Sequence, residues 1–427
     1  MSTLKVNKIR DTSGSTDAIT FDPSGGAVLA GVTTISTARI TTGISTSIQV
    51  GGGVTITESG IEASGIGITC ANINGTQIGG RRNLIINGGM SISQRYGTTA
   101  TTPAHTDYVI DRWENHLSQS SKFSVQHVED APSGEGVGKY SSKITSLSAY
   151  TVQTGDYFAY NQNIEGSNID YLNFGTSSAK TITVSFYVKS SLTGTFSLAI
   201  RNSAYNRSQV QEYTISSANT WERKSLTFAG DTSGTWLTTN AVGLRLSWGL
   251  GGGSSYHIAS TGTWLGVDDW TTSNSTSVVS TNAATWYITG VQMEIGTQAT
   301  PFEYRTVGEE LSLCQRYYYV LADARDHASA YQFMNIHGYS TAQVEGTVNF
   351  PVFMRTAPTI VQGAGTDYFN AMNANGGPLF SSLLLYQATS RVCLLYQNSL
   401  SANPATGAAY RCQFNNANAY VHFSAEL

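Results

Sequence analysis

Charged residues are scarce in this sequence. Asp, Glu, Lys and Arg together make up 12 % of its 427 residues, about half of the ~25 % typical of globular domains. The formal net charge is −4, and no basic run is present. Nucleic acids and anionic membrane surfaces both attract clustered Lys and Arg, so we expect neither kind of partner.

Cysteine and long apolar runs are also lacking. The four cysteines are Cys70, Cys314, Cys393 and Cys412, and none has the CxxC spacing of a zinc ribbon. We predict buried free thiols, made in a reducing cytosol. No stretch approaches the ~18–20 apolar residues of a membrane span, and the N-terminus lacks the apolar core of a signal peptide. We expect no membrane insertion and synthesis in the cytoplasm without a signal peptide.

Catalytic signatures are equally hard to find. No GxSxG elbow or HExxH motif occurs, and the seven histidines are scattered. The close acid groupings are Asp107 with Asp111 and Glu114, Glu129 with Asp130, and Asp268 with Asp269. Adjacent acids on a strand point to opposite faces, which does not suit the two facing carboxylates of a glycosidase. We therefore predict that the protein is not an enzyme, with a polysaccharide depolymerase as the catalytic alternative.

The residues that are abundant favour β-structure. Aromatics make up 11 %, with 23 Tyr, and there are 43 Gly. Apolar and polar residues alternate over 182–188, 196–200 and 242–248, which is the pattern of half-buried strands. Many such strands between turn clusters indicate a β-sandwich. Leu311, Cys314 and Tyr318 instead follow a helical period and predict one short helix between domains, acting as a hinge.

The first 82 residues differ from the rest. Phe21 is their only aromatic residue, and Ile and Val recur between Gly, Ser and Thr. This pattern predicts short strands joined by tight turns, although disorder is an alternative. Such a segment cannot build its own core, so we expect three copies to bury its Ile and Val against one another.

These observations predict an all-β protein of three parts. Residues 1–82 would form a fibrous β-shaft in a homotrimer. Residues 83–305 would form a jelly-roll-like β-sandwich. Residues 306–427 would form a β tip domain, preceded by the short helix.

Several motifs carry a family resemblance. They are Asn83–Met90 (NLIINGGM) with Ser93–Arg95 (SQR), Tyr108–Trp113 (YVIDRW), Thr289–Gly296 (TGVQMEIG) with Ala299–Glu303 (ATPFE), Glu309–Leu311 with Cys314–Tyr318 (CQRYY), and Phe350–Val352 with Met354–Thr359 (MRTAPT) and Ser424–Leu427 (SAEL). Taken in order, they resemble the sandwich and tip modules of phage tail fibres and spikes. The opening Leu4–Ile9 (LKVNKI) is similar to tail fibres of phages that infect cyanobacteria.

The resemblance implies a virion tail protein. It implies a homotrimer in which residues 1–82 include the virion-attachment segment, held to other tail proteins through the N-terminus, with the C-terminal region facing a host-surface glycan. It also implies a carbohydrate-binding-module-like sandwich. The expected function is attachment of the virion to a host receptor. Two alternatives remain open: a purely structural tail or baseplate component, and a depolymerase spike.

Sugar recognition needs aromatic faces and nearby amide or hydroxyl groups. Trp264 and Trp270 lie in a loop-like stretch and are candidates for it, as are Tyr368 and Phe369 in an Asn- and Gly-rich loop of the tip, where loop anchoring is the alternative. Trp113 and Trp248 are better explained as core residues. At least one of Tyr317, Tyr318 and Tyr319 should be exposed or lie at a trimer contact.

No cofactor is expected from the sequence. Carbohydrate-binding sandwiches often hold a structural Ca²⁺ through oxygen ligands, and Glu294 or Asp111 would be suitable donors. Because no dense acidic loop is present, the metal content stays unassigned.

Overall fold

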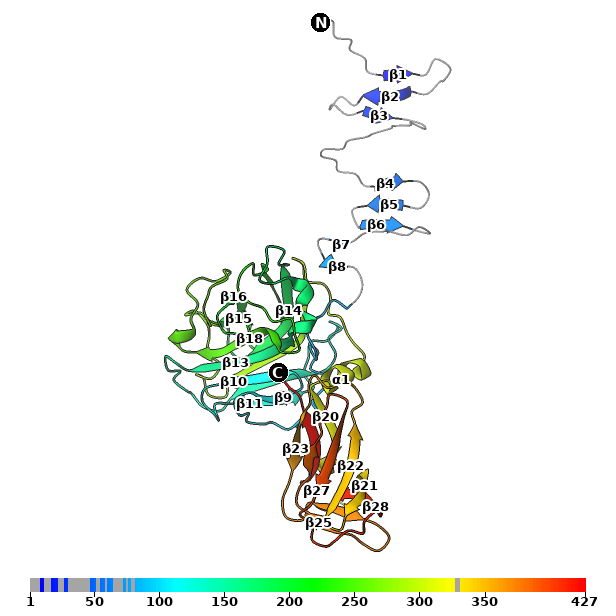
Figure 1. Cartoon of the computed structure of the whole chain (residues 1–427). Coiled ribbons are helices and arrows are strands. Elements are labelled where there is room, and N and C mark those ends of the chain that lie inside the picture. The colour runs from blue at the N-terminus through cyan, green and yellow to red at the C-terminus, as the bar shows by residue number, and fades with distance from the viewer. Residues whose placement is uncertain are drawn as a thin grey trace. The chain divides into compact units, whose positions relative to one another are not determined.

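The computed structural model describes residues 81–326 and 331–427, together with short strands between residues 8 and 77 (Figure 1). The chain divides into two compact units, Met1–Cys70 and Ala71–Leu427. The boundaries predicted at 82/83 and 305/306 stay predictions. Among the described residues, no helix has the length and apolar character to cross a membrane.

The N-terminal unit contains small antiparallel sheets. One sheet holds β1 (Lys8–Arg10), β2 (Asp17–Phe21) and β3 (Ala27–Leu29), and another holds β4 (Ser47–Val50), β5 (Val54–Thr57) and β6 (Gly60–Ala63). A hairpin of β7 (Asn72–Ile73) and β8 (Thr76–Gln77) follows in the second unit. These are the short strands that the Ile and Val spacing predicts. The connecting residues and Cys70 lie outside the described part, so the fibrous shaft and the trimer stay predictions.

Two antiparallel sheets make up the large domain of the second unit (Figure 1). The six-stranded sheet runs β16 (Ser208–Ile215), β15 (Gly194–Asn202), β18 (Val242–Gly252), β13 (Tyr157–Glu165), β10 (Trp113–Leu117) and β9 (Asp107–Ile110). The five-stranded sheet runs β11 (Phe123–Val128), β12 (Ser141–Ser146), β19 (Thr285–Ile295), β14 (Ile182–Ser190) and β17 (Glu222–Phe228). Short 3-10 helices elsewhere in this unit are η1 (Gly166–Asn168), η2 (Asp170–Leu172), η3 (Ser254–Tyr256) and η4 (Ala324–Asp326).

One hydrophobic cluster joins these two sheets into a sandwich. Alternate residues of facing strands supply it, as the period-two pattern predicts. Trp113 stacks on Tyr160 with ring centroids 5.2 Å apart, and Phe186 meets Trp248 edge to face at 5.6 Å. The core positions predicted for Trp113 and Trp248 are confirmed, because both side chains are fully buried.

Helix α1 (Val307–Gln315) follows the sandwich. Thr306 and Glu309 form a capping box, in which each side chain bonds the other residue's backbone N–H. The predicted helix is confirmed, and its role as a hinge stays a prediction. The Glu310 carboxylate accepts a 2.5 Å hydrogen bond from the backbone N–H of Asn87 and lies 3.4 Å from Arg305, which ties α1 to the sandwich.

The three consecutive tyrosines after α1 are more enclosed than predicted. Tyr317 and Tyr318 are buried and Tyr319 is half-buried. The helix ends before them, so Tyr318 and Tyr319 lie on opposite faces of β20 (Tyr318–Asp323). One face packs on the sandwich and the other on the aromatic core of the C-terminal region. None of the three is exposed, so that half of the expectation is wrong, and a trimer contact by one of them stays a prediction.

The C-terminal region contains two further antiparallel sheets (Figure 1). The smaller runs β20, β29 (Tyr420–Ser424) and β23 (Thr359–Gly363). The larger runs β25 (Leu379–Phe380), β24 (Phe369–Met372), β28 (Ala409–Phe414), β21 (Gln332–Ser340), β22 (Gln343–Asn349), β27 (Val392–Gln397) and β26 (Leu384–Tyr386). A second hydrophobic cluster, separate from that of the sandwich, fills this region. The all-β fold class is confirmed for the described residues.

Candidate functional site

The two loop tryptophans lie in different clusters. Trp270 is fully buried against Gly249 and Gly252, where a Cβ atom would meet the indole ring at 3.6 and 2.8 Å. Trp264 is partly buried, donates its Nε1–H to the carbonyl of Ala229 at 2.8 Å, and meets Trp236 edge to face at 5.5 Å. The structure therefore uses both rings to hold the loop on the sandwich. Receptor contact by either stays a prediction.

The tip-loop pair is also enclosed. Phe369 is fully buried and stacks on Phe380 with centroids 5.6 Å apart. Tyr368 is half-buried and packs against the C-terminal core. This placement favours the loop-anchoring alternative for Phe369, and receptor contact by Tyr368 stays a prediction.

The proposed calcium donors already have protein partners. Asp111 accepts hydrogen bonds from the backbone N–H and Nε2 of Gln94 at 2.6 and 2.7 Å. Glu294 accepts from the backbone N–H and hydroxyl of Thr300, both at 2.8 Å. Within the described residues, no group of three or more His, Cys, Asp or Glu side chains converges on a metal position. A calcium ion stays unassigned.

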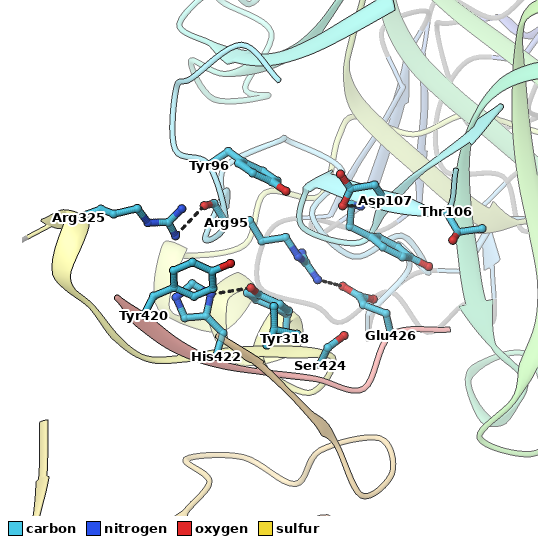
Figure 2. A pocket seen from close by; sticks show the side chains of 12 residues that line it. Arg95, Tyr96, Thr106, Asp107, Tyr318, Arg325, Tyr420, His422, Ser424 and Glu426 are labelled. Atoms are coloured by element: carbon cyan, nitrogen blue, oxygen red, sulfur yellow. Dashed lines mark hydrogen bonds and ion pairs between the residues drawn. The ribbon is translucent and has the colours of Figure 1, made fainter. Parts of the chain in front are cut away.

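A polar pocket of about 260 Å³ lies where the sandwich meets the C-terminal region (Figure 2). The Arg95 guanidinium lies 3.5 Å above the Tyr318 ring and donates to Glu426 at 2.8 Å. Glu426 also pairs with Arg112, whose guanidinium stacks 3.6 Å from Tyr317. These cations and anions neutralise one another, and their contacts hold the sandwich and the C-terminal region together at this pocket. We call this set of contacts the domain joint.

His422 stands on the C-terminal side of the domain joint (Figure 2). Its Nδ1 lies 2.6 Å from the Tyr318 hydroxyl, and its Nε2 lies 3.3 Å from Asp323. Burial lowers the pKa of His422 to about 4; Asp323 offsets part of this effect, and Arg325 and Arg95 add to it. The imidazole is therefore neutral at pH 7, and the Tyr318 hydroxyl donates to Nδ1.

A second polar region lies on the face of the six-stranded sheet that points away from the sandwich core. We call it the outer strip. Cross-strand register places its members side by side on neighbouring strands, because directly paired residues share a face. The outer strip consists of Glu114, Asn161, Asn163, Arg201, Arg245 and Ser247.

Asn161 occupies the centre of the outer strip. It pairs with Glu114 on β10 and with Ser247 on β18. Its carboxamide is fully buried, yet neither Oδ1 nor Nδ2 has a hydrogen-bond partner among the described residues. Buried polar groups are almost always paired, and an exception calls for an explanation by water or a ligand. The Nε of Arg245 is likewise buried without a partner.

The other polar groups of the strip hold one another in place. Asn163 donates to Glu114 at 2.5 Å and Arg245 donates to Asn163 at 2.9 Å. Both Nε and Nη2 of Arg201 donate to the Ser247 hydroxyl, at 3.3 and 3.0 Å. Burial alone would raise the pKa of Glu114, but the hydrogen bonds and charges of its neighbours His116, Arg245 and Asn163 outweigh this and lower it. These hydrogen bonds therefore pre-organise the polar side chains of the outer strip.

Rings border the outer strip. His105, His116, Tyr157 and Tyr256 follow one another with centroids 5.0, 4.6 and 5.8 Å apart. Burial lowers the pKa of His116, although Glu114 opposes this effect, so the ring is neutral at pH 7. Tyr205 lies over the other end of the strip, 5.4 Å from the Arg201 guanidinium and 4.8 Å from that of Arg245. Tyr205 is 37 % exposed.

This arrangement suits a ligand that carries both hydroxyl groups and apolar faces. The Asn161 carboxamide holds a donor and an acceptor that have no partner among the described residues, and the tyrosine and histidine rings have apolar faces. The outer strip was not predicted from the sequence. The signal was present in β13, where Tyr157, Asn161 and Asn163 alternate with core residues such as Tyr160 and Ile164. An outward row of asparagines on a buried strand is unusual, because such groups need partners.

Comparisons with known proteins give fold likenesses only. No family model and no curated protein matches this chain. Among solved structures, it is similar to the enzymatically active domain of tailspike protein 4 of Bacteriophage CBA120, with 13 % identity, a TM-score of 0.27, and coverage of 50 % of this chain and 21 % of that one. The chain thus spans about a fifth of that tailspike domain.

Carbohydrate-binding modules are also among the similar structures. One is TmCBM61 in complex with β-1,4-galactotriose, with 10 % identity, a TM-score of 0.25, and coverage of 50 % of this chain and 99 % of that one. Another is the family 11 module from Clostridium thermocellum in complex with a β-1,3-1,4-mixed-linked tetrasaccharide, with 12 % identity, a TM-score of 0.25, and coverage of 48 % and 100 %. Likenesses at this level carry no argument about function.

Proposed function

We propose that this protein binds a carbohydrate through the outer strip, and that it does so as a phage tail fibre attaching the virion to a host-surface glycan. The observation that carries the proposal is the buried, unpartnered carboxamide of Asn161. A sugar hydroxyl can donate to its Oδ1 and accept from its Nδ2, which would satisfy both atoms at once. Sites that leave polar groups unpaired in the free protein gain most from a ligand that pairs them.

The rings around the strip support the same ligand class. A pyranose presents an apolar C–H face and a rim of hydroxyls. Tyr205 and the row from His105 to Tyr256 supply apolar surface beside the polar floor. Arg201 pairs with Asp268 at 2.7 Å, and Arg245 lies 3.5 Å from Glu114. The charges of the outer strip therefore nearly cancel. This balance favours recognition of hydroxyl groups over a strongly charged ligand.

The virion role extends this binding to attachment. The motifs that resemble phage tail fibres and the predicted trimer of the N-terminal segment support it. Three copies would present three equivalent strips, and avidity could then strengthen attachment by ~10²–10⁴-fold if all sites engage. A purely structural tail component would not need a pre-organised polar strip whose central carboxamide has no protein partner.

The test is a binding measurement on the full chain. We would titrate neutral and uronic-acid-containing oligosaccharides by isothermal calorimetry into wild type, Tyr205→Ala and Tyr171→Ala. Tyr171 is a matched control, because it is 39 % exposed on η2, outside the strip, against 37 % for Tyr205. We expect Tyr205→Ala to weaken binding about tenfold or more and Tyr171→Ala to leave it unchanged.

Two results would count against the proposal. Absence of binding to any oligosaccharide or to whole cells by wild type would favour the structural alternative. Release of shorter oligosaccharides from host envelope polysaccharide would instead favour the depolymerase.

A further inference from the structure

Three tyrosines meet on the seven-stranded sheet of the C-terminal region. Tyr339 on β21, Tyr386 on β26 and Tyr396 on β27 line one hollow of about 420 Å³. Tyr339 is 61 % exposed and Tyr386 is 54 % exposed. Single exposed aromatic side chains need no explanation, but several gathered in one place mark a ligand or interaction site. We call this hollow the tyrosine hollow.

Strand register places these residues on the sheet face away from the core. Tyr396 pairs with Glu345 on β22, and Tyr386 pairs with Leu394 on β27. The intervening residues Cys393 and Leu395 point to the other side and are buried in the C-terminal cluster. The tyrosine hollow is therefore built on rigid strands, which position side chains more tightly than loops do.

Polar groups accompany the rings of the hollow. Gln343 donates to Glu345 at 2.8 Å, and His337 lies 3.7 Å from the same carboxylate. Tyr386 and Tyr396 meet edge to face at 6.1 Å. Leu394 is the aliphatic member of the lining, and Asn398 adds an amide at its border. A lining that combines tyrosine rings with amide and carboxylate groups fits a sugar better than it fits an aliphatic protein surface, because a sugar pairs with the polar groups as well as with the rings.

The charge of the hollow narrows the ligand further. Among its lining residues Glu345 is acidic and none is Lys or Arg. An anionic sugar would meet the Glu345 carboxylate without a cation to balance it, whereas a neutral sugar can donate a hydroxyl to it. We propose that the tyrosine hollow is a second carbohydrate site, specific for neutral oligosaccharides and separate from the outer strip. This inference shares with the proposed function only the premise that the chain binds glycans.

The experiment uses the full chain and defined probes. Neutral hexose tetrasaccharides and matched hexuronic acid tetrasaccharides would be tested by saturation-transfer NMR and titration. The protein would carry Tyr205→Ala, so that the outer strip is weakened. In this background we expect residual binding of neutral probes. Adding Tyr339→Ala and Tyr386→Ala should weaken it at least tenfold, and adding Glu345→Gln should admit hexuronates.

The control is Phe353→Ala in the same background. Phe353 lies in the same region, outside the hollow, and is 57 % exposed. This variant should bind as the background does. The inference is overturned if the double tyrosine variant binds neutral probes as the background does, or if it changes only the oligomeric state, which would make the hollow a contact between copies. Binding that depends on Tyr205 alone would overturn this inference while leaving the proposed function intact.

Discussion

Arg112 and Glu426, 314 residues apart in the sequence, form an ion pair that joins the sandwich to the C-terminal end of the chain. The Arg112 guanidinium is almost fully buried and also donates to the carbonyl of Asn163 at 2.7 Å. The Tyr108 hydroxyl donates to the carbonyl of Leu427 at 2.8 Å beside it. The last residues of the chain therefore rest against the edge of the outer strip and fix the C-terminal region to it.

Removing Glu426 should destabilise this joint strongly. Glu426→Ala leaves two arginines, Arg112 and Arg95, buried without their shared anion. Breaking a buried pair from one side typically costs about 3–5 kcal/mol. Urea unfolding monitored by tryptophan fluorescence measures this loss. Lys139→Ala removes one partner of an exposed pair with Glu129 and should leave the midpoint nearly unchanged; equal effects would contradict the buried joint.

His422 should make stability depend on pH. Its pKa is lowered to about 4 in the folded protein, against ~6.5 in an unfolded chain. As pH falls from about 6.5 to 4, the His422 side chain binds a proton in the unfolded chain but not in the folded protein, so the free energy of unfolding decreases. The loss should be on the order of 2–3 kcal/mol.

The measurement compares the unfolding midpoints of wild type and His422→Gln between pH 7 and pH 4. The variant should be the less pH-sensitive of the two. His116 and His127 also have pKa values lowered by burial, so some dependence should remain. Identical slopes would show that His422 does not titrate as described.

Gly88 in the NLIINGGM motif should tolerate no side chain. A Cβ atom there would lie 2.1 Å from the carbonyl oxygen of Val291. Gly88→Ala should cost roughly 3 kcal/mol or more. The same substitution at Gly308 in α1 meets open space and should stabilise by about 0.5–1 kcal/mol. Thermal unfolding of the two variants checks the contrast, and similar melting temperatures would refute it.

The described cysteines should resist labelling in the folded protein. Burial raises the pKa of the Cys393 thiol to about 12 and raises those of Cys314 and Cys412 as well. Thiolates are the reactive form, so a maleimide should reach these residues only after unfolding. Peptide mass spectrometry at pH 7 before and after denaturant gives the answer residue by residue. Rapid labelling of any of the three in the native state would contradict their burial.

The sequence alone predicts much of this fold, because strand periodicity and the helix cap are local signals. The sandwich core around Trp113 and Trp248 and helix α1 follow from such signals. The burial of Trp270 does not, because it depends on how the loop folds back so that the ring lies against Gly249 and Gly252 of the preceding strand, β18. Tyr317 and Tyr318 are likewise enclosed by Arg112 and Arg95, residues more than two hundred positions away.

The candidate sites were harder to predict than the fold. Exposed loops were the reasonable place to look for ligand contacts, but Asn161 and the three tyrosines of the tyrosine hollow stand on strands. Asn161 can be recognised as a candidate only when the strand pairing that places Glu114 and Ser247 beside it is known. Tyr339, Tyr386 and Tyr396 come together only through the register of β21, β27 and β26.

The substitution Asn161→Ala tests the central claim most directly, by measuring oligosaccharide affinity and unfolding free energy on the same protein. Removing a buried carboxamide that has no protein partner should leave the unfolding free energy unchanged or raise it. The oligosaccharide affinity should fall by about tenfold or more, because the outer strip loses the Asn161 donor and acceptor together. Unchanged affinity with a marked loss of stability would contradict the account, since Asn161 would then serve the fold and not a ligand.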